Sequence, residues 1–169
     1  HPHCRRQRQM CIRDRNYIII THPEEIFKKY SDELKSSSNP PLSIMTDVQP
    51  NPDYKDILEL QNKFSSINES VDYILAIGGG SVTDTAKAIA AFKDKQEYLT
   101  DFVRNKKSPR VENPIKIIAI PTTSGTSSEL TCWATIWDKE KNNKLSLAHK
   151  SLYAEKAIID PSIMVDKPL

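Results

Sequence analysis

Short apolar runs alternate along this chain with longer segments in which apolar residues recur every three or four positions. Runs of the first kind are typical of buried strands, and segments of the second kind are typical of amphipathic helices. The pattern predicts strands at 17–21, 42–46, 73–77, 115–120 and 157–160, and helices at 23–35, at 53–67, from the glycines after residue 77 to residue 92, and around 98–104. Because strands and helices alternate, we expect a doubly wound α/β fold with a mostly parallel sheet and helices on both faces.

Two further apolar segments, 130–137 and 144–148, flank the polar stretch 138–143 and predict a β-hairpin with a polar tip. Residues 1–15, by contrast, show no apolar periodicity, and residues 9–15 look like translated vector sequence. We therefore expect residues 1–15 to be a disordered, non-native leader and leave them out of the fold. The remainder, 16–169, is then one α/β domain that is truncated at both ends.

Composition narrows the class of protein. Hydrophobic residues make up 38% and charged residues 27% of the 169 positions, which suits a soluble globular protein, and no apolar run is long enough to cross a membrane. The net charge is +2, but residues 1–15 hold five arginines against one aspartate, so the rest of the chain carries −2. Nucleic-acid binding therefore has little support. Three cysteines without paired spacing favour a reducing, cytoplasmic location.

The central strand ends in Gly78-Gly79-Gly80-Ser81, which a helix-like pattern follows at once. Glycine permits positive φ and close approach to a ligand, and the start of a helix offers unpaired N–H groups to a phosphate. Ser81 stands where an N-cap is expected, with Asp84 three residues later as in a capping box. Phosphate binding and a plain tight turn with a capped helix are both consistent with this stretch. The dinucleotide fingerprint G-x-G-x-x-G is not present in it.

A second loop, 121–129 (PTTSGTSSE), follows the fourth predicted strand and carries six hydroxyl side chains in the seven positions 122–128. These hydroxyls either bind a ligand beside the glycine turn or cap their own backbone. Both loops follow strands of a parallel sheet, and ligands of such sheets bind at the carboxyl ends of the strands. The two loops can therefore face one ligand.

Together the two loops resemble the motifs of the iron-containing (group III) alcohol dehydrogenases, within the larger group that includes glycerol dehydrogenase and dehydroquinate synthase. The matching segments are 78–87 (GGGSVTDTAK) and 121–129, with softer matches at 48–52 and 157–161. The order and spacing agree from about residue 17 onward. One departure lies in the second loop, where Ser127 stands in place of the usual glycine, and we expect it to stiffen that loop.

The resemblance implies roles for individual residues. Gly79, Gly80 and Ser81 would bind the pyrophosphate of NAD or NADP, and Asp84 would lie near the nicotinamide. Thr122 and Thr123 would contact the adenine side of the cofactor or its phosphates. Lys144 would contact the ribose; the alternative is that Lys144 is a solvated lysine of the hairpin without a role in binding.

The resemblance also implies what this chain lacks. Members of the family hold iron, or another divalent metal, with one aspartate and three histidines in an all-helical second domain, which would begin just after Leu169. We therefore expect no metal ligand and no catalytic residue in this chain.

The expected function is that of a fragment of a metal-dependent alcohol dehydrogenase, inactive by itself. The parent protein would transfer hydride between NAD(P) and a small alcohol or aldehyde. A homo-oligomer is one assembly that the parent could form. Two alternatives stay open: a nucleotide-binding fragment without a reaction of its own, and an enzyme of the glycerol dehydrogenase or dehydroquinate synthase type.

Overall fold

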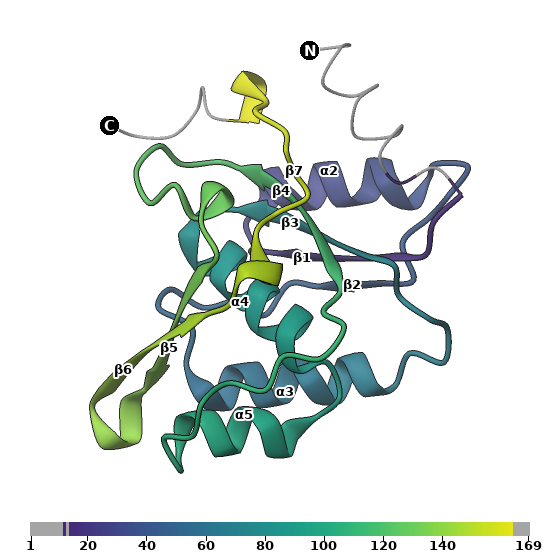
Figure 1. The fold of residues 1–169 in the computed structure, drawn as a ribbon. Helices are drawn as coiled ribbons and strands as arrows, with labels where there is room; N and C mark the ends of the chain where they lie inside the picture. The colour runs from purple at the N-terminus through teal and green to yellow at the C-terminus, as the bar shows by residue number, and fades with distance from the viewer. Residues whose placement is uncertain (1–11, 13, 164–169) are drawn as a thin grey trace.

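A computed structural model describes residue 12 and residues 14–163 of the chain. Their main feature is a five-stranded sheet of order β2-β1-β3-β4-β7, in which every neighbouring pair is parallel (Figure 1). The strands are β1 (Tyr17–Thr21), β2 (Ser43–Met45), β3 (Tyr73–Gly78), β4 (Lys116–Pro121) and β7 (Lys156–Ala157). The parallel sheet confirms the predicted fold class. The last strand is shorter than predicted, since only two of its residues pair with β4.

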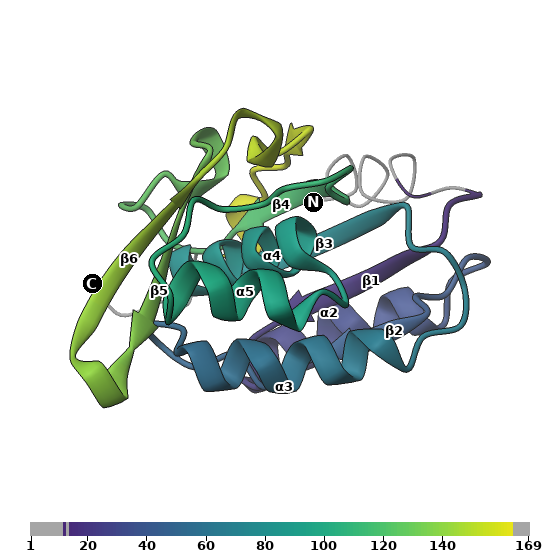
Figure 2. The same ribbon diagram turned by 60° about the horizontal axis from the view of Figure 1, so that its bottom comes forward.

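Helices cover both faces of the sheet, as predicted. They are α2 (Glu25–Lys35), α3 (Tyr54–Ser65), α4 (Gly80–Phe92) and α5 (Gln96–Val103). Helix α2 lies on one face, whereas α3, α4 and α5 lie on the other, as the two ribbon views show (Figures 1 and 2). Short 3-10 turns connect the later elements: η1 (Ser128–Leu130), η2 (Lys139–Lys141), η3 (Lys150–Leu152) and η4 (Pro161–Ile163).

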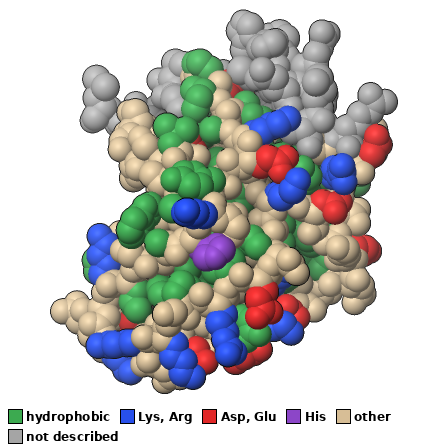
Figure 3. Space-filling view, in the orientation of Figure 1, with side chains coloured by type: hydrophobic (Ala, Val, Ile, Leu, Met, Phe, Trp, Pro, Cys, Tyr) green, Lys and Arg blue, Asp and Glu red, His purple; other side chains and the backbone are tan. Residues whose placement is uncertain are grey.

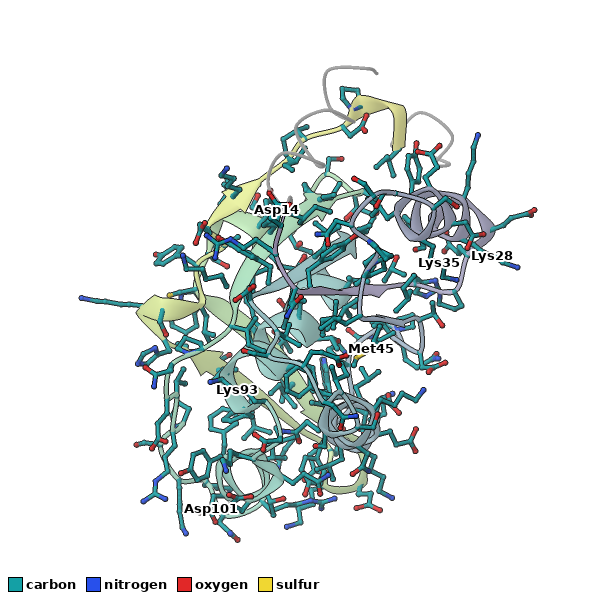
Figure 4. All side chains as sticks on the ribbon, turned by 90° about the vertical axis from the view of Figure 1, so that its right-hand side faces the viewer. Asp14, Lys28, Lys35, Met45, Lys93 and Asp101 are labelled. Carbon is teal, nitrogen blue, oxygen red and sulfur yellow. The ribbon has the colours of Figure 1, made fainter. Side chains whose placement is uncertain are left out.

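Alternation along the strands divides the core into two layers. In β3, Ile74 and Ala76 pack in the cluster that includes α3, α4 and α5, whereas Leu75 and Ile77 pack in the cluster that includes α2. Successive side chains of a strand point to opposite faces, so an unbroken apolar run is what a sheet covered on both faces requires. Figure 4 shows Met45 pointing inward from its strand. It is 1% exposed and belongs to the first cluster.

The predicted hairpin forms a separate two-stranded sheet of β5 (Trp133–Asp138) and β6 (Asn143–Ala148). It projects from the side of the molecule next to α4 (Figure 1). The prediction that its first strand begins at residue 130 was wrong, because residues 128–130 form the turn η1 instead.

The prediction for residues 1–15 falls largely outside the described residues. Of that stretch the structure describes Ile12, Asp14 and Arg15, and Ile12 is 2% exposed in the layer that includes α2. The prediction of a non-native leader therefore stays a prediction. None of the described helices is long and apolar enough to cross a membrane. On the face seen in Figure 3, Lys and Arg side chains lie beside Asp and Glu side chains rather than forming a uniformly basic surface.

Candidate functional site

The two loops singled out in the sequence lie side by side because β3 and β4 are neighbours. Gly78 is the register partner of Pro121, and the backbone amide of Thr122 donates to the Gly78 carbonyl at 3.1 Å. Both strands run in the same direction, so both loops leave the sheet at its carboxyl edge. The expectation that they meet at one place is confirmed.

The glycines of the turn are required for close packing rather than for positive φ. A Cβ added at Gly80 would lie 2.7 Å from Thr126 Oγ1, and one at Gly79 would lie 3.0 Å from Thr123 Oγ1. The turn does not use the positive φ that glycine permits: Gly79 has φ −80°, and among the described glycines the positive value, 151°, belongs to Gly125. The turn therefore omits Cβ atoms so that the hydroxyl loop can lie against it.

Helix α4 begins two residues earlier than the motif suggested. Its N-cap is Gly79, and its first hydrogen bond runs from the Thr83 amide to the Gly79 carbonyl at 3.1 Å. Ser81 therefore lies within the first turn, and its Oγ accepts from the Asn51 amide at 3.1 Å. The predicted N-cap role was wrong. The amides of residues 80–82 precede the helical ladder and point out of the helix start, where an anion is favoured.

Asp84 likewise does not complete a capping box. Its Oδ2 accepts from the Thr135 amide in β5 at 2.9 Å, which ties the hairpin to the helix. Burial raises the pKa of Asp84, while the Thr135 amide and the nearby Lys87 ammonium act to lower it. A partly buried carboxylate thus stands one helical turn beyond Gly80.

Sequence reasoning assigned no role to Lys87, although it ends the matched glycine motif. The residue is 0% exposed, and its Nζ donates to the carbonyls of Ser128, Thr131 and Trp133 at 2.6, 2.7 and 2.7 Å. Burial lowers the pKa of Lys87, and the Asp84 carboxylate opposes that shift. The signal in the sequence was its neighbours: Lys87 stands among small and apolar residues (TAKAIAAF), and the structure buries all of them.

The elements around the helix start enclose a cleft of about 440 Å³. Its lining comes from the loop after β2, the start of α4, the hydroxyl loop and the hairpin: Asn51, Pro52, Gly80, Ser81, Asp84, Thr126, Ser128, Thr131, Trp133, Thr135, Trp137 and Lys144. Four predicted residues, Gly80, Ser81, Asp84 and Lys144, are brought together here. The other three are not among the lining residues: Gly79 lies against Thr123, which is exposed, and Thr122 is buried at the end of β4.

Sequence reasoning missed the aromatic wall of the cleft. Trp133, Thr135 and Trp137 share one face of β5, whereas the residues between them are buried on the other face. The alternation along 133–138 is visible in the sequence and could have indicated this wall. Lys144 from β6 places its Nζ 5.5 Å from the centre of the Trp137 ring, within cation–π range.

A larger hollow, of about 570 Å³, lies at the opposite end of the sheet, around Asp72, Tyr73 and Lys116. It faces the amino ends of β3 and β4 and has neither the glycine turn nor the start of α4. Ligands of open parallel sheets bind at the carboxyl ends, so the 440 Å³ cleft is the candidate site.

In the described part of the chain, no group of three or more His, Cys, Asp or Glu side chains lies close enough together to hold a metal ion.

A parallel sheet covered on both faces, with a cleft at the carboxyl ends of its strands, defines a doubly wound α/β domain. The family model for iron-containing alcohol dehydrogenase matches residues 4–161. The chain belongs to the iron-containing alcohol dehydrogenase family, which is a family of oxidoreductases.

Similar proteins share parts of their length with this chain. An aldehyde-alcohol dehydrogenase of Streptococcus pneumoniae is 36% identical over 137 residues, which are 74% of this chain and 15% of that protein. Lactaldehyde reductase of Escherichia coli K12 is 35% identical over 126 residues, 75% of this chain and 32% of the relative. The chain therefore spans a third or less of these two relatives.

Solved structures agree with the fold. NADH-dependent butanol dehydrogenase A of Thermotoga maritima superposes with a TM-score of 0.75 at 26% identity, covering 98% of this chain and 42% of that one. Sulfoacetaldehyde reductase of Bifidobacterium kashiwanohense, solved in complex with NAD+, gives a TM-score of 0.82 at 23% identity, covering 96% and 43%.

Proposed function

We propose that this chain is the dinucleotide-binding part of an alcohol dehydrogenase that transfers hydride between NAD(P) and a small alcohol or aldehyde. The observation that carries the proposal is the shared carboxyl edge of β3 and β4. There the start of α4, the hydroxyl loop and the hairpin surround one cleft of about 440 Å³. Family membership supplies the reaction type, and the names of the relatives agree with it.

In this proposal the pyrophosphate lies at the start of α4, where the amides of residues 80–82 and the helix dipole favour negative charge. The absence of Cβ atoms at Gly79 and Gly80 fits a close approach of backbone to ligand. Ser81 borders this position, and Thr123, which is exposed beside Gly79, contacts the same phosphates. Thr122 is buried, so we assign it to holding the two strand ends together.

The hairpin side of the cleft would hold the rest of the cofactor. Lys144 donates to a ribose hydroxyl, and Asp84 lies near the nicotinamide. The rings of Trp133 and Trp137, on the same hairpin as Lys144, line this side of the cleft. The cofactor supplies the hydride chemistry, while the residues of this chain bind and orient it.

The proposal is tested by titrating the purified chain with NADH and with NADPH. Trp133 and Trp137 line the cleft, so binding should quench tryptophan emission and excite the reduced nicotinamide by energy transfer. Ser81→Asp places a negative charge at the helix start and should weaken binding at least about tenfold, because it repels the pyrophosphate. Ser70→Asp makes the same change at an exposed position before β3, beside the other hollow, and should leave binding unchanged.

Equal weakening by both substitutions, or saturable binding that neither of them changes, would contradict the proposed cleft. We further propose that the 169-residue chain alone does not turn over. Adding Fe²⁺ or Zn²⁺ with a panel of small aldehydes should give no NADH oxidation above the protein-free rate. Metal-dependent oxidation by the chain would overturn this second statement and leave the binding proposal standing.

A further inference from the structure

The side chain of Lys87 is 0% exposed, and its three N–H groups match three close carbonyl partners. Its three N–H donors meet the backbone carbonyls of Ser128, Thr131 and Trp133 at 2.6–2.7 Å. Each of these three residues also lines the 440 Å³ cleft. One lysine on the buried side of α4 therefore holds three points of the cleft wall from behind.

The backbone of segment 128–133 has one short hydrogen bond, from the Leu130 amide to Ser127 O at 2.9 Å, and two longer ones. The Thr131 amide donates to Ser128 O at 3.4 Å, and the His149 amide donates to Cys132 O at the same distance. The segment also begins after Ser127, whose φ of 49° is left-handed. The contacts from Lys87 are shorter than these bonds and join the segment to a helix that is itself packed on the sheet.

The need to fill space in the core does not explain why a lysine stands at position 87. An apolar side chain of similar length would occupy the same space without bringing an ammonium out of water. It would also leave three carbonyls without their donor, which is costly in a buried position. None of the ion pairs within 4.0 Å among the described residues includes Lys87, and the Asp84 carboxylate acts to raise its pKa.

We propose that Lys87 is a positioning residue: it fixes the backbone of 128–133 in the shape that receives the dinucleotide, without touching the dinucleotide itself. The predicted effect of Lys87 on cofactor affinity rests on the proposed function. Its effect on the backbone of 128–133 does not depend on any ligand. The two effects are therefore measured separately.

The first measurement uses the unaltered chain. A lysine ¹⁵N spectrum should show one ammonium group protected from solvent, with couplings through its hydrogen bonds to the carbonyl carbons of residues 128, 131 and 133. The signal should be missing from Lys87→Arg. Absence of a protected ammonium in the unaltered chain would overturn the inference, whether or not any variant folds.

The second measurement compares Lys87→Met with Ile89→Ala by amide hydrogen exchange. Ile89 is 0% exposed on the same helix and belongs to the core cluster, so its truncation lowers stability without removing a donor from the cleft wall. Lys87→Met should speed exchange of residues 128–135 at least about tenfold relative to β1 and β3, since the loss is local. Ile89→Ala should not change that ratio.

The third measurement is NADH affinity. Lys87→Met should raise the dissociation constant at least about tenfold, Ile89→Ala less than about twofold, and Lys87→Arg, which keeps a cationic donor, should fall between them. Normal affinity in Lys87→Met, despite faster exchange, would overturn the effect on the cofactor. If the unaltered chain binds no NADH, the proposed function fails, while the exchange and ammonium measurements still decide whether Lys87 positions the wall.

Discussion

The glycine turn and the hairpin border the same cleft, but different forces hold them in place. The turn is a direct continuation of β3 into α4, and its position follows from strand pairing and from the close contacts of Gly79 and Gly80 with threonines. The hairpin belongs to a separate sheet. Polar contacts with other elements, in addition to packing of its buried face, fix it at both ends.

At the base of the hairpin these contacts come from α4, through Asp84 and Lys87. At its tip, Arg104 forms ion pairs with Asp138 and Glu140, and Asp53 accepts from the Lys139 amide at 2.9 Å. One wall of the cleft is thus held by steric fit, and the other by polar contacts between elements. Substitutions should therefore damage the two walls in different ways.

The largest effect is expected at the turn. In Gly78→Ala the new Cβ would lie 2.4 Å from Val82 Cγ2, so the start of α4 must shift away from β3. We expect a loss of about 3 kcal/mol of unfolding free energy, near the upper end of what overpacking usually costs. Chemical denaturation measures it. The double variant with Val82→Ala should recover part of the loss, and losses that simply add would contradict the steric explanation.

A smaller loss is expected at the tip of the hairpin. Asp53 is 6% exposed and its two oxygens accept from the Lys55 amide, as the N-cap of α3, and from the Lys139 amide. Asp53→Ala should cost about 1–2 kcal/mol, because it removes the cap and leaves the second amide without its acceptor. Asp53→Asn retains one acceptor oxygen and should lose less. Equal losses in both variants, measured by thermal and chemical unfolding, would argue against these bonds.

A gain is expected where the hydroxyl loop is strained. Ser127 has φ 49° and ψ 29°, a left-handed conformation that glycine adopts without cost. The expectation that serine stiffens this loop stays a prediction. The strain at position 127 comes from the left-handed backbone, which is costly for a residue that has a Cβ. Ser127→Gly should raise unfolding free energy by about 0.5–1 kcal/mol. The matched change Ser124→Gly, at a position outside the left-handed region, should not stabilise; equal gains would contradict the role of strain.

The smallest effect is a pH dependence at the base of the hairpin. Burial raises the pKa of Asp84 above its ordinary 3.8, so its contribution to stability is fully present below pH 3.8 and is lost as the pH rises through the raised value. Asp84→Asn keeps an acceptor for the Thr135 amide and does not titrate. The difference in unfolding free energy, wild type minus Asp84→Asn, should therefore fall with rising pH above 3.8. A flat or rising difference would mean that burial does not control this carboxyl group.

Much of the fold was predictable because its information is local. Alternation of apolar runs and helical periods located four of the five parallel strands within about two residues, and the order of strands and helices indicated the parallel sheet. The first hairpin strand was placed too early because Leu130, Thr131 and Cys132 continue the alternation of apolar and polar residues that runs through 133–138. The residues near position 128 in the sequence do not indicate that carbonyls of this segment bind Lys87, which lies about forty positions earlier.

By itself, the sequence determined the strands, the helices and the two loops that follow neighbouring strands, since each depends on residues close together in the chain. Only the tertiary structure decided that Ser81 binds Asn51 rather than capping α4, that Asp84 binds the hairpin, and that Lys87 lies behind the cleft wall. Those partners are 30, 51 and 41 positions apart. Periodicity carries no information over such separations, because the packing of whole elements brings these atoms together.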